Sequence, residues 1–135
     1  MFKVKDKITL IMILFNIVLL IYFSIQLLIF TDEFAAKNIG FFNHAVAGLS
    51  EIIGIIFFCL AIGLITIILR GPDNQFPLFS TVLLMEAIIS LNFWRYVITN
   101  SPGETNIEII TINAYLFSFM SLSMIITMMR LKNFI

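Results

Sequence analysis

Five polar residues interrupt two otherwise apolar segments of this chain, and their side chains are the ones best suited to chemistry. They are His44, Glu51, Glu86, Asn92 and Arg95. An ionisable side chain is costly inside a bilayer, so its presence on a membrane segment points to function by default. These five are therefore the candidate site residues.

Helical spacing places His44 and Glu51 on one face of the segment from about 41 to 69. Positions seven residues apart differ by only ~20° around a helix, and the small residues Ala47 and Gly48 accompany them. A face that combines small residues with an acid is typical of the interior of a helical membrane protein.

Arg95 lies near the depth of His44 on the next segment, and its long side chain could span the remaining ~8 Å to Glu51. One hypothesis is an outward-opening pocket for a lipid-like or small anionic ligand. Its lining would be His44, Glu51, Asn92 and Arg95. Two simpler alternatives stay open: Glu51 and Arg95 form a structural ion pair, or Arg95 extends to the lipid phosphates.

Glu86 lies deeper, about 20 Å inside the outer boundary by the helical rise. It faces away from the other candidates and has no cation at its own depth. Because desolvation disfavours the charged form of a carboxyl, we expect Glu86 to be protonated. It is the candidate proton-titrating group, and the alternative is a neutral acid that hydrogen-bonds a neighbouring helix.

The sequence argues against several other kinds of site. A metal centre needs several converging His, Cys or carboxylate ligands, and the chain has one histidine and one cysteine, Cys59. It carries no nucleophile–base motif, phosphate loop or dinucleotide fingerprint. The formal net charge of zero gives no electrostatic reason to bind nucleic acid. We therefore expect no catalytic residue, metal, cofactor or nucleic-acid partner.

The composition is that of a membrane protein. Hydrophobic residues make up 61% of the chain and charged residues 12%, whereas soluble domains carry roughly 25% charged residues. Four apolar segments, each long enough to cross a bilayer as a helix, follow one another within a single domain, residues 1–135. Their limits are about 8–30, 41–69, 76–99 and 107–129. The polar connection at 31–40 has room for one short interfacial turn.

Lysine and arginine are distributed unevenly between the two sets of connections. One side holds Lys3, Lys5, Lys7, Arg70, Arg130 and Lys132. The other side holds Lys37 alone outside the apolar segments. Because short connections rich in Lys and Arg stay in the cytoplasm, we expect both termini inside and the connections at 31–40 and 100–106 outside. The predicted location is a bacterial-type inner (cytoplasmic) membrane.

Small residues predict how these segments pack. Ala47, Gly54 and Ala61 recur every seven residues, which would let a neighbouring helix approach closely. The predicted fold is all-α, an integral membrane antiparallel four-helix bundle.

This layout resembles the DoxX-like group of small four-helix bacterial membrane proteins. The similarity is carried by the stretch NHAVAGLSEIIG at 43–54 and by EAIISLNFWRYVITNSPG at 86–103. The resemblance implies a four-helix bundle. Most members of that group have no established activity, and some are linked to oxidoreductase systems.

Three functional classes follow from the sequence. The first is an accessory or assembly subunit of a larger membrane complex, because the chain is small and has no catalytic motif. The second is the outward-facing pocket described above. The third is an oligomeric proton-coupled transporter that uses Glu51 or Glu86. The expected partners are membrane lipids and other membrane subunits or further copies of this chain, and a self-contained enzyme is the least favoured class.

Overall fold

A computed structural model describes residues 3–38, 40, 43–100 and 106–131, and within these ranges all regular structure is α-helical. The helices follow one another without an intervening strand in the described residues. They are α1 (Lys7–Leu28), α2 (Thr31–Asn38), α3 (His44–Arg70), α4 (Phe76–Thr99) and α5 (Ile107–Arg130).

The four long helices match the four predicted segments, and α2 is an addition. The limits of α4 are those expected, and the other three differ by one to three residues. Residues 41 and 42, in the expected second segment, lie outside the described residues. The connection at 31–40 was expected to hold one short turn, but α2 occupies eight of its residues. Its first turn carries Asp32 and Glu33 and its last turn carries Lys37, which suits the helix dipole at both ends.

Side-chain caps explain where three of the helices begin. The Asp6 carboxylate accepts a hydrogen bond from the Thr9 backbone N–H at 3.1 Å, and Asn43 Oδ1 accepts one from Val46 at 2.8 Å. Asn106 caps α5 in the same way. Each cap satisfies a backbone donor that the first helical turn leaves without a partner.

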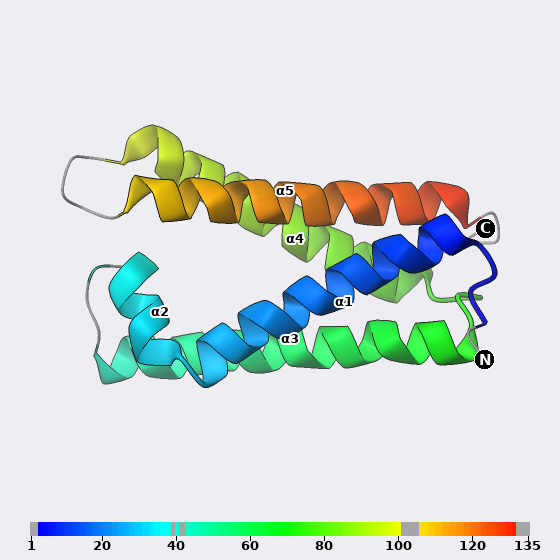
Figure 1. Cartoon of the computed structure of the whole chain (residues 1–135), viewed down its shortest axis with the longest axis horizontal. Coiled ribbons are helices and arrows are strands. Elements are labelled where there is room, and N and C mark those ends of the chain that lie inside the picture. Colours follow the sequence, from blue (N-terminus) through cyan, green and yellow to red (C-terminus); the bar gives the residue numbers. More distant parts are fainter. Residues whose placement is uncertain (1–2, 39, 41–42, 101–105, 132–135) are drawn as a thin grey trace.

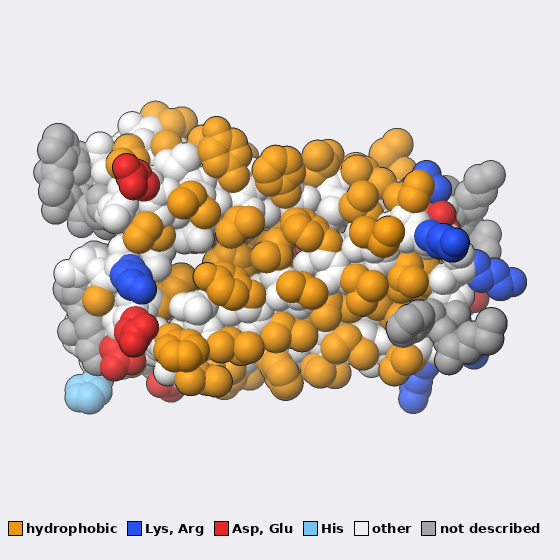
Figure 2. Space-filling view, viewed as in Figure 1, with side chains coloured by type: hydrophobic (Ala, Val, Ile, Leu, Met, Phe, Trp, Pro, Cys, Tyr) orange, Lys and Arg blue, Asp and Glu red, His pale blue; other side chains and the backbone are white. Residues whose placement is uncertain are grey.

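The long helices are apolar enough and long enough to cross a membrane. Figure 2 shows hydrophobic side chains over the middle of the visible face and charged side chains gathered at its two ends. A middle band free of charge is what a bilayer requires of a spanning protein. These features indicate a multi-pass membrane protein.

Helix α1 lies between α3 and the packed pair formed by α4 and α5. It packs against α3 on one side and α5 on the other, and α4 packs along α5. Helix α2 lies at one end of the molecule, where it contacts α1, α3 and α5 (Figure 1). We call this the α2 end. The opposite end, where α1 begins and α3 and α5 end, is called the basic end.

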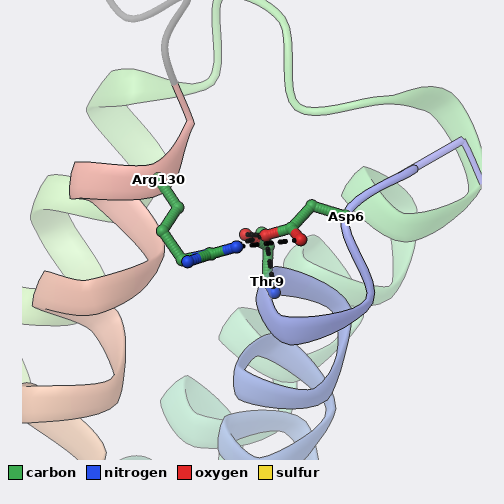
Figure 3. Close-up of polar contacts among 3 residues, drawn as sticks. All are labelled: Asp6, Thr9 and Arg130. Atoms are coloured by element: carbon green, nitrogen blue, oxygen red, sulfur yellow. Dashed lines mark hydrogen bonds and ion pairs between the residues drawn. The ribbon is translucent and has the colours of Figure 1, made fainter.

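Two contacts hold the basic end together. The Arg130 Nε donates to the Asp6 Oδ2 at 2.8 Å, so the start of α1 meets the end of α5 (Figure 3). The backbone N–H of Lys3 donates to the Ile68 carbonyl at 3.0 Å. The Arg130 guanidinium, followed by the Thr9 hydroxyl, holds the pKa of Asp6 well below its usual range.

The predicted small-residue seam on α3 is partly realised. A Cβ placed on Gly54 would lie 2.8 Å from Leu28 Cγ, so α1 and α3 approach closely there. Ala61 is fully buried. Gly48, in contrast, has no atom within 4 Å of where its Cβ would be. The close approach therefore belongs to the middle of α3 rather than to its first turns.

Candidate functional site

Four of the five predicted site residues lie on the surface. His44, Glu51, Asn92 and Arg95 are all exposed. The Arg95 guanidinium lies over the ring of Tyr96, 4.9 Å from its centroid. Among residues 3–38, 40, 43–100 and 106–131 the ion pair found is Asp6–Arg130, and Glu51 and Arg95 are not joined. The structure does not bring these four residues into one pocket, and their role in ligand binding stays a prediction.

A polar cavity opens elsewhere, at the α2 end between α1, α2 and α5. Its volume is about 210 Å³. Its lining residues are Tyr22, Phe23, Gln26, Glu33, Phe34, Lys37, Asn38, Ile109 and Asn113. The lining therefore contains one acid, one base and three side-chain amides, which can donate and accept hydrogen bonds.

An amide–amide hydrogen bond holds the wall of this polar cavity. Asn113 Nδ2 on α5 donates to Asn38 Oδ1 on α2 at 2.9 Å. Asn38 Nδ2 donates in turn to the Phe34 carbonyl at 2.8 Å. The short helix α2 is thus fastened to α5 by a side chain, and its charged residues are held at the cavity.

An aromatic cavity of about 180 Å³ adjoins the polar cavity. Every lining residue is apolar: Phe23, Leu27, Phe34, Ile53, Phe57, Ile89, Phe93 and Phe117. The rings pack on one another, with centroids 4.8 Å apart for Phe23 and Phe117 and 5.7 Å apart for Phe93 and Phe117. Phe23 and Phe34 line both cavities. A polar cavity and an apolar cavity therefore share two lining side chains.

Glu86 is the fifth predicted residue, and it lies in the interior. Its side chain is 0% exposed. In the part of the chain that the structure describes, neither carboxyl oxygen has a hydrogen-bond partner. One turn further along α4, the Ser90 hydroxyl lies 2.7 Å from the Ser118 hydroxyl, which also accepts from Trp94 Nε1 at 3.0 Å. Glu86 is thus enclosed by protein, while its predicted depth in the membrane stays a prediction.

A second polar contact joins α1 to α5 in the core. Asn16 Nδ2 donates to the Ser123 hydroxyl at 2.5 Å and to the Met12 carbonyl at 2.8 Å. Asn16 Oδ1 is buried and has no hydrogen-bond partner among the described residues. Hydrogen bonds of this kind connect helices where lipid offers no polar alternative.

Sequence reasoning did not select the residues that line the polar cavity. Gln26, Glu33, Lys37, Asn38 and Asn113 lie in separate stretches of the chain. Asn113 carries a usable signal, because an asparagine in the middle of an apolar segment needs a partner. No sequence pattern identifies Asn38 as that partner.

Within the described ranges, no group of three or more His, Cys, Asp and Glu side chains is arranged to hold a metal ion. Comparison with protein-family models, with curated proteins and with solved structures found no match. The resemblance to the DoxX-like group accordingly stays a prediction.

Proposed function

We propose that this protein binds a membrane-soluble amphiphile, with its polar head in the polar cavity and its apolar part in the aromatic cavity. The observation that carries the proposal is the pair of adjoining cavities, which share Phe23 and Phe34. Ligand sites are concave, mostly apolar and furnished with a few polar groups that fix orientation. The sequence hypothesis of a lipid-like ligand is retained, with a different set of lining residues.

The proposed orientation puts the polar cavity on the outer side of the membrane. Arg70, Arg130 and the lysines near the start of α1 lie at the basic end, whereas Lys37 lies at the α2 end. This asymmetry favours a cytoplasmic basic end. The head of the ligand would then lie near the outer interface, with the aromatic cavity beneath it, in a bacterial-type inner membrane.

Sizes support a small head and a short apolar part. A water molecule occupies about 30 Å³ of liquid, so the polar cavity of about 210 Å³ could hold a head of a few heavy atoms. The aromatic cavity of about 180 Å³ could hold the first part of a chain or one ring. The rest of a longer ligand would extend into lipid between the helices.

Native mass spectrometry on protein extracted gently from its membrane tests the proposal. We expect a bound small molecule on the wild-type chain. Ile53→Trp, which puts a larger side chain into the aromatic cavity, should release it. Ile56→Trp is the matched control: it lies on the same helix, is 47% exposed against 44% for Ile53, and does not line either cavity. It should retain the ligand.

Two results would overturn the proposal. The first is a wild-type chain that carries no small molecule, and the second is equal ligand retention by the two variants. A copurifying protein of fixed stoichiometry, with no small molecule, would instead favour the accessory-subunit hypothesis.

A further inference from the structure

The buried carboxyl of Glu86 has no role in the two cavities, and its surroundings call for a separate explanation. A carboxylate buried in a membrane protein is stable only when a cation or several hydrogen-bond donors compensate its charge. In the described part of the chain Glu86 has no hydrogen-bond partner on either oxygen. Both oxygens are nevertheless fully shielded from solvent and lipid.

A hydrogen bond between α4 and α5 relates the level of Glu86 to that of Ser123. Ser90 meets Ser118 across the α4–α5 contact. On α4, Glu86 lies four residues from Ser90 in the direction of the basic end. On α5, Ser123 lies five residues from Ser118 in the same direction. With the helical rise these displacements are about 6 Å and about 7.5 Å. Glu86 and Ser123 are therefore at nearly the same level.

Asn16 belongs to that level as well, because its amide donates to the Ser123 hydroxyl. Helices α1, α4 and α5 thus each contribute one buried polar side chain at one depth. We call Asn16, Glu86 and Ser123 the polar layer. Its unpaired atoms in the described residues are the Asn16 carbonyl oxygen and the two Glu86 oxygens. All three are oxygens, so the layer has spare acceptors and lacks a donor.

No cation faces this layer from the helices around it, within the residues described above. The ionisable side chains inside the spans, apart from Glu86, are Tyr22, Glu51, Cys59, Arg95, Tyr96 and Tyr115. All of these are exposed. The remaining charges on the long helices, such as those of Arg70 and Arg130, are at the helix ends and are exposed too.

We propose that Glu86 is a proton-binding site in the membrane interior, set in the polar layer to which α1, α4 and α5 each contribute one side chain. A bound proton removes the charge that nothing nearby compensates, and it supplies the donor that the layer lacks. This assignment is independent of the amphiphile proposal, because none of the residues of the polar layer lines the polar or the aromatic cavity.

Infrared spectroscopy on the full chain in lipid nanodiscs tests the proposal without a ligand. A protonated carboxyl has a C=O stretch well separated from the bands of a carboxylate. At pH ~7 exposed Asp and Glu side chains are ionised, so we expect one protonated-carboxyl band from the wild type. The band should disappear in Glu86→Gln and persist in Glu51→Gln, which removes an exposed glutamate of α3.

A third variant keeps the test decisive if Glu86→Gln does not fold. Glu86→Asp retains a carboxyl on a shorter side chain, so the band should shift and stay present. The proposal is overturned if the wild type shows no protonated-carboxyl band at pH ~7, since the site would then carry no proton. It is equally overturned if the band survives in folded Glu86→Gln, because another group would be its source.

Discussion

Substitution of Gly54 by alanine should destabilise the protein, whereas the same substitution at Gly48 should not. Both glycines lie on α3. A Cβ on Gly54 would meet Leu28 Cγ at 2.8 Å and Leu27 Cβ at 3.0 Å. A Cβ on Gly48 would have no atom within 4 Å. The two positions therefore differ in packing, while the change in chemistry is identical.

The magnitude follows from these distances. Carbon atoms normally touch at about 3.5 Å or more, so the new Cβ at Gly54 would be about 0.7 Å too close to Leu28 Cγ. Leu28 can relieve its contact only by changing its side-chain rotamer, whereas Leu27 Cβ is fixed to the backbone, so α1 must also shift slightly. Overpacking of this kind costs about 1–3 kcal/mol. Alanine favours a helix over glycine by about 1 kcal/mol, and this gain is common to both variants.

The free energy of unfolding of Gly54→Ala should therefore be lower than that of Gly48→Ala by about 1–3 kcal/mol. Reversible unfolding in mixed micelles, followed by circular dichroism, would measure this difference. Gly48→Ala should be as stable as the wild type or more stable. If Gly54→Ala and Gly48→Ala are equally stable, this result would contradict the close approach of α1 and α3 at Gly54.

Two further perturbations test contacts at the basic end and in the α4–α5 interface. Because Arg130 lowers the pKa of Asp6, their interaction should stabilise the fold fully above about pH 4 and progressively less as the pH falls below that value. Asp6→Asn should lower the free energy of unfolding at neutral pH. In the same unfolding assay, this variant should also show a weaker dependence of stability on acid pH. Ser118→Ala leaves the Trp94 indole N–H without its acceptor, so it should cost about 1–2 kcal/mol and shift the tryptophan fluorescence. Ser121→Ala is its control, since the Ser121 hydroxyl donates to a backbone carbonyl within α5, and an equal effect of both variants would contradict the assigned role of Ser118.

The long helices were predictable because their signals are local. Segment 76–99 was expected with the limits that the structure has, since the turn residues at 70–75 and the polar stretch from Asn100 mark its ends. The depth of Glu86 could be predicted for a similar reason, because depth follows from position along one helix; its burial against the other helices depends on their packing and was not predicted. The helical nature of α2 was missed, since a segment of eight mostly polar residues carries no membrane-spanning signal.

The cavities were not predictable, because they depend on which helices meet. Periodicity identifies the face on which Glu51 lies, and it does not identify the helix that the face contacts. One candidate partner of Glu51 was Arg95 on α4, yet α4 packs along α5 and both side chains are exposed. Asn113 and Asn38, 75 residues apart in the chain, form the contact that shapes the polar cavity. Such a pair requires a three-dimensional arrangement to be recognised.

The position of α1 between α3 and α5 also has a consequence for biogenesis. Domains form from the N-terminus onward during synthesis, so α1 enters the bilayer long before α5 exists. Asp6 and Arg130 are 124 residues apart, and α1 must therefore keep one flank free of its final neighbour until α5 has been synthesised. During that interval lipid, an insertase or another nascent helix covers the flank. Helix α5, the latest of the four long helices to be made, is the one that completes the environment of α1.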